Sequence, residues 1–520
     1  NAVHQHLESR GKSVIIRLLS PSRQNRFDNM RQLVPFPAPV QTARIEVFLK
    51  PSCFSLIKKG SMRKVSALLL ASERRAISGL AGLYASRMLG LFMVLPVLAL
   101  YADTLAGATP LLVGVALGIY GLTQATLQIP FGLLSDRIGR KRVIAMGLVI
   151  FALGSVVAAL SDTIAGVIAG RALQGGGAVA AAIMALLADQ TREEVRTAAM
   201  ATIGLSIGVS FAIAMVLGPW LAAWAGLAGV FWFTALLTLV GLLVLWRWVP
   251  AAPRRRRHRD VGMDRQQFKS VITRPDLWRL DISIFALHLV LMAIFVAVPF
   301  RLLNAGVAIE YHGLAYLGIM ALSFVAMVPL IIVAEKQQRM RLMCLLAIGA
   351  IVISLAGLGL PLSSGYWLFV WLFVFFTGFN LLEATLPSML SKLAPAGAKG
   401  TAMGVYSTSQ FLGAFLGGTL GGLLANYGGL NAVFIGCALF ALCWWAAMWR
   451  MPSPPPLSSE VVALHETQPD ALDLLMEHLA DVVGVEDVMV VPEERLVYLK
   501  VNRQQLDQAA LTRLMAPPKS

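Results

Sequence analysis

Charged side chains are scarce in this chain of 520 residues. Asp, Glu, Lys and Arg make up only 14% of the sequence, whereas hydrophobic residues make up 57%, and the mean hydropathy is +0.71. Soluble globular domains carry roughly 25% charged residues. The composition therefore excludes a soluble protein and predicts an integral membrane protein whose partner is the lipid bilayer.

Cysteine and the motifs of catalysis are also scarce. Of the four cysteines, Cys344, Cys437 and Cys443 stand in apolar runs, and Cys53 lies in a doubtful leader. The sequence has no catalytic triad, metal-ligand cluster or redox cysteine pair, so we expect neither an enzyme nor a metal or cofactor. The loop Gly-x-x-x-x-Gly-Lys-Ser/Thr is absent as well, which disfavours an ATP-driven pump.

Apolar runs long enough to cross a bilayer follow one another along most of the chain. A transmembrane helix needs about 20 mainly apolar residues. The runs are centred near Met93, Leu122, Leu153, Ala180, Ala212, Leu239, Met292, Ala321, Ala350, Phe373, Phe415 and Leu439. Hydropathy therefore predicts twelve helices, six before the loop at Pro253 and six after it.

The formal net charge of +16 comes from basic residues that gather in alternate loops. They cluster at 63–75 before the first run, at 137–142 after the second and at 254–269 after the sixth, and Arg301 interrupts the alternation. By the positive-inside rule, both ends of the chain and the central loop are expected in the cytoplasm. The basic excess then reflects topology and anionic lipid head groups, and no nucleic-acid partner is expected.

Two echoes indicate that the two sets of six runs are copies of each other. Pro130 precedes Arg140 by the same number of residues by which Pro329 precedes Arg339, and a second echo links the starts of the fifth and eleventh runs. Charged turns between helices resemble one another in any case, but paired echoes favour duplication. Duplicated halves place a substrate path at their interface near the membrane midplane.

Three segments, 132–141, 171–175 and 204–219, carry short motifs. Their residues are Gly132, Asp136, Arg137, Gly139, Arg140 and Lys141, then Arg171, Gln174 and Gly175, then Gly204, Gly208, Gly218 and Pro219. These segments resemble motifs of the major facilitator superfamily: the first its signature loop between the second and third helices, the second a motif in the fourth helix, and the third a glycine-rich motif of its proton antiporters. The resemblance covers about Met62 to the C-terminus.

This resemblance implies an all-α membrane protein with twelve transmembrane helices in two six-helix pseudo-repeats, located in the bacterial inner (plasma) membrane. It implies a secondary active transporter that works by alternating access and exports a small organic compound in exchange for protons. A proton symporter or uniporter is the alternative within transport. A membrane sensor that does not transport is a further alternative, because an extra domain follows the last helix.

The resemblance also implies a conformational latch at the charged turn. The residue that matches Asp136 is expected to meet the start of the eleventh helix near Gly400 and Thr401, and the cation that matches Arg140 is expected to reach Asp189. A carboxylate at a helix N-terminus contributes about 0.3 to 2 kcal/mol, enough to bias a near-balanced equilibrium between outward-open and inward-open states. The latch would comprise Gly132, Asp136, Arg137, Gly139, Arg140, Lys141 and Asp189. The alternative is a turn that only sets topology.

Ionisable groups inside the predicted spans are few, and an unpaired charge there is costly. The candidates for a proton and substrate path are Arg87, Arg171, Gln174, His288 and Glu383. The resemblance implies proton transfer at Arg171, since a cation lowers the proton affinity of a nearby acid. Glu383 is the candidate proton carrier, with a structural hydrogen bond as its alternative. Arg87 could instead snorkel to the interface, and His288 could be satisfied locally.

The glycines of the fifth run have two interpretations. Gly204 and Gly208 have a spacing that permits close helix packing in lipid. Gly218 and Pro219 are expected to break the helix, and the resemblance implies that this break seals the protein against proton leak.

The ends of the chain differ from its middle. The predicted order is a non-native or disordered leader at 1–61, a six-helix bundle at 62–249, a basic linker at 250–278, a second bundle at 279–450, a Pro-rich spacer at 451–458 and a small domain at 459–516. The last reads as β-α-β-β-α, which resembles a ferredoxin-like α+β domain. It lacks cysteine, which excludes a thiol metal site, and it is expected to serve regulation or oligomerisation.

Overall fold

The structure, a computed structural model, describes most of the chain after Leu69. The described residues are 70–250, 271–360, 365–394, 399–451, 457–463, 469–491, 496–502 and 505–514. The predicted leader and most of the predicted linker lie outside them. At the end of that linker, the first helix of the second half already begins at Pro275.

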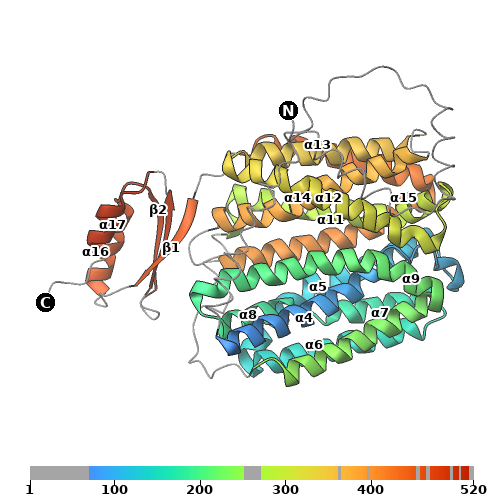
Figure 1. Ribbon diagram of the computed structural model, residues 1–520, viewed down its shortest axis with the longest axis horizontal. Helices are drawn as coiled ribbons and strands as arrows, with labels where there is room; N and C mark the ends of the chain where they lie inside the picture. Colours follow the sequence, from blue (N-terminus) through green and yellow to red (C-terminus); the bar gives the residue numbers. More distant parts are fainter. Residues whose placement is uncertain are drawn as a thin grey trace, which may run out of the picture. The chain divides into compact units, whose positions relative to one another are not determined.

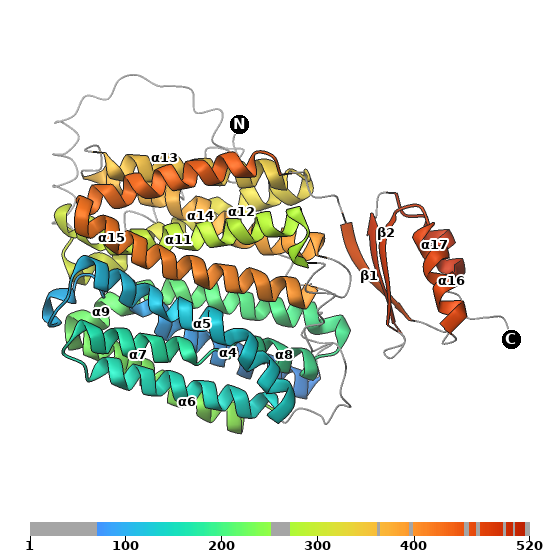
Figure 2. The same ribbon diagram turned by 180° about the vertical axis from the view of Figure 1, so that it is seen from behind.

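The membrane part consists of two sets of long helices. Residues 70–250 form α4 (Ala71–Met93), η3 (Ala102–Thr104), α5 (Pro110–Ile138), α6 (Arg140–Ala159), α7 (Ile164–Gly176), α8 (Ala180–Gln190) and α9 (Glu193–Arg247). Residues 271–451 form α11 (Pro275–Asn304), η5 (Ile309–Tyr311), α12 (His312–Lys336), α13 (Met340–Gly359), α14 (Tyr366–Leu393) and α15 (Lys399–Met448). Figure 1 shows the first set from blue to green and the second from yellow-green to orange, and Figure 2 shows both from behind.

Local sequence sets where several of these helices begin. The Thr109 side chain accepts a hydrogen bond from the Leu112 backbone N–H (3.2 Å) at the start of α5, and Thr163 accepts one from Gly166 (3.2 Å) at the start of α7. Such caps satisfy donors that have no partner within the helix. α11 begins with Pro275, whose missing N–H is not needed in the first turn.

The first helix lies earlier in the chain than predicted. Arg74 and Arg75, expected to precede it, lie inside α4, and Met93, expected at its centre, is its last residue. Pro96 follows closely, and proline removes a helical hydrogen bond and restricts the residue before it. Residues 94–101 continue as turns that are as apolar as the helix. Hydropathy counted these turns as part of the span, which moved its predicted centre.

Ten helices among the described residues are long and apolar enough to span a membrane, with α7 and α8 counted together. Two of them, Thr202–Arg247 and Gly400–Met448, are 46 and 49 residues long. Each contains one glycine with a non-helical backbone, Gly226 (φ 66°) and Gly429 (φ 73°), at which two helices join. Glycine adopts positive φ without a steric penalty. Counting each as two spans gives twelve, and the number of crossings stays a prediction.

Equivalent contacts support the predicted duplication of the two halves. Lys141 Nζ, at the start of α6, donates to the Val249 carbonyl (2.7 Å). Arg341, at the start of α13, donates to the Trp449 carbonyl, and the two residues of each pair are 108 positions apart in the sequence. A shared contact at a shared spacing is what duplication of a six-helix unit predicts.

Close glycine contacts repeat in the same way. A Cβ atom on Gly218 of α9 would lie 2.4 Å from the Met93 carbonyl oxygen, and one on Gly421 of α15 would lie 2.6 Å from the Ala293 Cα atom. In each half, the first part of the long hairpin therefore packs backbone to backbone on the half's first helix. Small residues permit this approach, which drives helix association in lipid.

The C-terminal domain has the predicted element order. β1 (Leu457–Ala463), α16 (Pro469–Ala480), β2 (Val485–Val491), β3 (Leu496–Asn502) and α17 (Gln508–Leu514) follow one another. The strands form an antiparallel sheet in the order β1-β3-β2. Val497, Leu499 and Val501 of β3 are fully buried, as the two-residue period of a strand requires, and pack with Leu479 and Leu511 of the helices. The sheet therefore forms the expected α+β unit.

Candidate functional site

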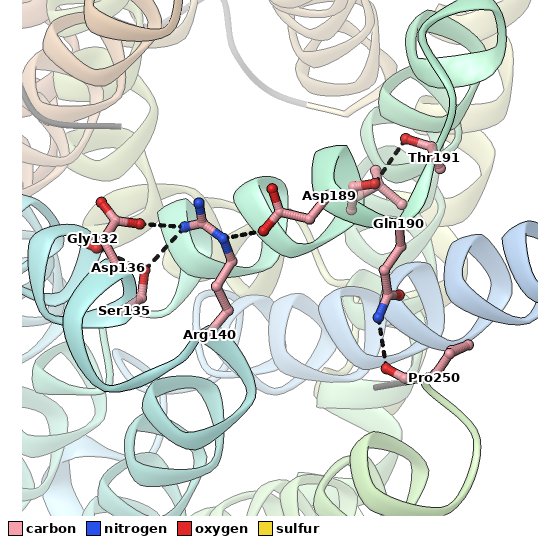
Figure 3. Close-up of polar contacts among 9 residues, drawn as sticks. Gly132, Ser135, Asp136, Arg140, Asp189, Gln190, Thr191 and Pro250 are labelled. Atoms are coloured by element: carbon pink, nitrogen blue, oxygen red, sulfur yellow. Dashed lines mark hydrogen bonds and ion pairs between the residues drawn. The ribbon is translucent and has the colours of Figure 1, made fainter. Parts of the chain in front are cut away.

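The charged turn joins α5 to α6 and carries one network of ion pairs (Figure 3). Arg140 Nη1 lies 2.7 Å from Asp136 Oδ1 and donates to Ser135 Oγ at 3.3 Å, while its Nε pairs with Asp189 of α8. The Ser135 hydroxyl donates to the Gly132 carbonyl (2.7 Å). The Arg140 side chain is only 11% exposed. The expected pair of Arg140 and Asp189 is therefore present.

Gly139 permits the tight geometry of this turn. It lies between the last residue of α5 and the first of α6 with φ 102° and ψ 133°, a region that side chains with a Cβ rarely adopt. α6 consequently begins at Arg140, which points back toward the end of α5. Lys141 turns away and bonds to the end of α9, and Arg137 is exposed.

One part of the predicted latch is not formed in this arrangement. The partner of Asp136 is Arg140, and no contact joins Asp136 to Gly400 or Thr401 within the described part of the chain. No described atom lies within 4 Å of a Cβ placed on Gly400. The Asp136 side chain is 23% exposed. The contact expected between Asp136 and the start of α15 is therefore absent among the described residues in this arrangement.

Two arginines lie deep in the N-terminal half. Arg87 of α4 is 1% exposed, and its Nη2 donates to the Tyr120 hydroxyl (2.8 Å) and to Gln124 Oε1 (2.7 Å) of α5. Gln124 in turn donates to Gln128 Oε1 (3.3 Å). The guanidinium also lies 5.6 Å from the centre of the Phe151 ring. Arg87 therefore faces the interior of the bundle and does not snorkel to the membrane surface.

Arg171 is the second buried arginine and is fully enclosed. Its Nη1 donates to Gln174 Oε1 (2.9 Å), and its Nε and Nη2 donate to the Ala116 and Leu117 carbonyls (3.3 and 3.4 Å). Gln174 Nε2 donates to Ser155 Oγ (2.8 Å). The Arg-x-x-Gln motif thus joins α7, α6 and α5 through one polar cluster without a carboxylate.

The C-terminal half holds a matching polar cluster around His288 of α11. Gln410 of α15 donates to His288 Nε2 (2.8 Å) and to Glu383 Oε1 of α14 (3.4 Å). The opposite ring nitrogen of His288 lies 3.2 Å from the Ile284 carbonyl, which fits the tautomer with its proton on Nδ1. His288 Nε2 and Glu383 Oε2 are 3.9 Å apart. The structure therefore brings two predicted path residues together, through a glutamine.

Gly218 and Pro219 do not break α9, which corrects the predicted kink. The helix keeps helical backbone angles through Pro219 and bends only at Gly226. Neighbouring helices can stabilise a proline inside a membrane helix, and Gly218 packs on α4. Gly204 and Gly208 have no described atom within 4 Å of a Cβ placed on them. The predicted close packing of these two glycines is therefore absent in this arrangement.

Sequence reasoning missed two acidic residues, one buried and one partly buried. Glu73, in the first turn of α4, is 2% exposed and bonds to Arg192 Nε (2.8 Å) and to the Leu70 backbone N–H (2.9 Å). Asp281 of α11 has a buried Oδ1 without a hydrogen-bond partner among the described residues. Asp281 precedes His288 by seven residues, which is two helical turns. This spacing, which places Asp281 and His288 on one face of α11, could have been recognised in the sequence.

The two halves touch along α5 and α15. A Cβ on Gly114 would lie 2.1 Å from the Gly418 carbonyl oxygen, and one on Gly118 would lie 2.5 Å from that of Phe415. α12 approaches α9 in the same manner at Gly313. All these contacts lie at the end of the bundle away from the charged turn. We call the end that carries the turn the turn end and the opposite one the far end.

The described residues offer no group of side chains suited to binding a metal ion. No cluster of three or more His, Cys, Asp or Glu side chains could hold a metal ion there. Cys344, Cys437 and Cys443 are free thiols in the described part of the chain.

Two duplicated helical halves with polar groups buried on either side of their interface define a membrane transporter. A model of the Major Facilitator Superfamily matches residues 80–418 and 348–482. The chain belongs to this superfamily. It is 46% identical over 443 residues to the inner membrane transport protein YajR of Escherichia coli (strain K12), covering 84% of this chain and 97% of that protein. The chain is therefore a multi-pass protein of the inner membrane.

The chain is also similar to other transporters. An uncharacterized transporter of Buchnera aphidicola subsp. Acyrthosiphon pisum is 34% identical over 329 residues, 63% of this chain and 84% of its own length. A bacterial homologue of the human lysosomal transporter Spinster, solved in an inward-facing and occupied conformation, has a TM-score of 0.61 at 14% identity, covering 74% of this chain and 98% of that one. A D-xylose-proton symporter reaches 0.59 at 14% identity, with coverage of 74% and 98%. These structures are similar in fold alone.

Proposed function

We propose that this transporter exchanges a small organic compound for protons by alternating access, with export of the compound. The observation that carries the proposal is that the halves pack tightly at the far end and stand apart at the turn end. Glycines bring α5 and α15 together at the far end. At the turn end, a Cβ placed on Gly204, Gly208, Gly400 or Gly404 would have no described atom within 4 Å.

The basic residues give this arrangement a direction. By the positive-inside rule the turn end and both chain termini face the cytoplasm. The described arrangement then corresponds to an inward-open state. An outward-open state would bring the turn end together and let Asp136 meet the start of α15, a contact worth about 0.3 to 2 kcal/mol. Such a contribution biases the two states without fixing either of them.

The cluster of His288, Glu383 and Gln410 supports proton coupling. Glu383 Oε2 is a buried oxygen without a hydrogen-bond partner among the described residues, although the Glu383 side chain as a whole is 39% exposed. A carboxyl group that is partly enclosed and partly open can bind a proton on one side of the cycle and release it on the other. Binding of a proton to Glu383 would not displace Gln410 or His288, which stay in place as fixed hydrogen-bond partners within the cluster.

The test is transport in proteoliposomes with an imposed pH gradient and a broad panel of compounds. We expect flux of at least one compound against the direction of proton flow, and loss of this coupling in Glu383→Gln. Glu310→Gln is the matched control, because Glu310 is exposed in η5, just before α12. Flux that ignores the gradient would indicate a uniporter, and flux in the direction of the protons a symporter. No flux for any compound would favour a sensor.

The C-terminal domain is proposed to regulate the transporter or to support its assembly on the cytoplasmic side. A truncation after Arg450 tests this role. We expect the truncated chain to keep transport in proteoliposomes, with a changed rate or oligomeric state. A truncated chain that behaves like the full chain in both respects would contradict the proposal.

A further inference from the structure

We propose that the buried guanidinium group of Arg87, supported by Arg171, binds the negatively charged group of the transported compound, and that this compound is a small organic anion. The inference rests on the transport function proposed above and names its substrate class. The observations that carry it are the two buried charges of the N-terminal half and the unused donors of Arg87.

These two positive charges have no counter-ion in the described part of the N-terminal half. Arg87 is 1% exposed and Arg171 is 0% exposed. Every acidic residue between 70 and 250 lies near a helix end or in a loop: Glu73, Asp103, Asp136, Asp162, Asp189, Glu193 and Glu194. A buried charge without a partner is costly, and proteins keep such charges in membranes mainly where they serve a substrate or ion.

The two arginines differ in how many of their donors are used. All three nitrogens of Arg171 donate to neutral acceptors, namely Gln174 and two backbone carbonyls. Arg87 donates through Nη2 alone, and its buried Nε and Nη1 have no partner among the described residues. Buried donors are almost always satisfied in folded proteins. The unused donors of Arg87 therefore mark the position at which an acceptor is missing.

The charge of the pair favours an anionic acceptor over a neutral one. Both guanidinium groups lie against the ring of Tyr120, with their central carbons 5.9 Å (Arg87) and 5.3 Å (Arg171) from its centre. Two like charges across one ring repel each other in a medium of low dielectric constant. The ring offers each of them only a weak cation–π attraction. An anion beside Arg87 would reduce this repulsion and would also accept hydrogen bonds from the unused donors of Arg87.

The position of the pair fits a substrate site between the halves. The Tyr120 ring contacts Phe411 of α15 (6.3 Å between centres), and the preceding residue, Gln410, holds His288 and Glu383. Two neighbouring residues in one turn of α15 thus contact the cationic group of one half and the titratable group of the other. Rings also face each other across the halves at Phe211 and Phe379 (6.5 Å). Such rings suit the apolar body of an organic anion.

A charge-compensating variant tests the missing counter-ion without any added compound. Gln124→Glu places a carboxylate 2.7 Å from Arg87 Nη2 with little change of shape. We expect the purified full chain with this change to show a higher midpoint of thermal denaturation than the wild type. Gln128→Glu is the matched control, one turn further along the same helix and without a hydrogen bond to Arg87; it should lower the midpoint. Equal falls in both variants would overturn the proposal.

A binding panel tests the substrate class directly. Benzoate, benzamide and benzylamine, and butyrate, butyramide and butylamine, are compared at constant ionic strength by their shift of the thermal midpoint. We expect carboxylates alone to raise it, and the rise to disappear in Arg87→Gln and Gln124→Glu. Arg301→Gln is the control, since Arg301 bonds to Leu358 and Asn431 within the other half.

The panel also separates this proposal from the transport function. Binding is measured in detergent without a gradient, so a failure of proton exchange would leave the carboxylate response unchanged. A response to amides or amines as large as that to carboxylates, or no response to any carboxylate, would overturn the inference. A carboxylate response that persists in a folded Arg87→Gln variant would overturn the role of Arg87.

Discussion

Replacing Gly114 by alanine should weaken the contact between the halves at the far end. The new Cβ would lie 2.1 Å from the Gly418 carbonyl oxygen and 2.8 Å from the Gly422 Cα atom. Ordinary contacts of a Cβ begin near 3.4 Å, so α5 and α15 must separate by about 1 Å. Neither obstacle is a flexible side chain. The strain therefore cannot be relieved by a rotamer change.

The size of the effect follows from the cost of overpacking, which is typically about 1 to 3 kcal/mol. The strain applies only while the far end is closed, so it shifts the equilibrium toward the outward-open state by roughly 5- to 150-fold. Alanine is the smallest change that tests this reasoning. It also favours helix over glycine by about 1 kcal/mol, so α5 itself should not be destabilised.

Electron–electron double resonance between spin labels at Asp103 and Tyr427 measures the shift. Both residues are exposed near the far end, one in each half, and Tyr427 is 81% exposed. The four native cysteines are first replaced by alanine. We expect a longer distance to gain population in Gly114→Ala. Gly318→Ala is the control, because no atom of the described residues lies within 4 Å of a Cβ at Gly318. Identical distance distributions in both variants would refute the reasoning.

Three further changes test other contacts. Asp136→Asn keeps the shape of the turn but removes the charge expected at the start of α15, so transport in proteoliposomes should slow at normal expression; wild-type rates would exclude a latch. Glu73→Gln leaves Arg192 without its buried anion and should cost about 1 to 3 kcal/mol, seen as a lower thermal midpoint that exposed Glu310→Gln does not show. Asp281→Asn removes a charge whose Oδ1 has no partner among the described residues, so the midpoint should stay or rise; a fall would show an important partner.

Much of the architecture could be predicted because lipid imposes simple rules on sequence. The apolar runs, the alternating basic loops and the echo around Pro130 and Pro329 required no knowledge of contacts. The pair of Arg140 and Asp189 was also accessible, because a turn with a known pattern places its cation near the end of a specific helix. These features depend on position along the chain and on charge, which the sequence states directly.

The buried polar contacts could not be predicted for a physical reason. Arg87 meets Tyr120 and Gln124 because α4 and α5 present particular faces to each other, and a helix that is apolar on all sides gives little periodic signal for its orientation. The same uncertainty hid the role of Gly218, which packs on α4 and does not kink α9. Hydropathy identifies a membrane span but does not define how the helix is rotated about its own axis.

The contacts of Asp136 bear on whether the turn sets topology or acts as a latch. A carboxylate offers about four acceptor sites on its two oxygens, and in this arrangement Arg140 engages only Oδ1. The network of Arg140, Ser135 and Asp189 lies wholly within one half, so it holds Asp136 in place whatever the other half does. Asp136 could therefore keep Arg140 and still accept N–H groups from α15 in the proposed state with a closed turn end. A turn that only set topology would need the cations but not a carboxylate that Arg140 holds through one oxygen alone.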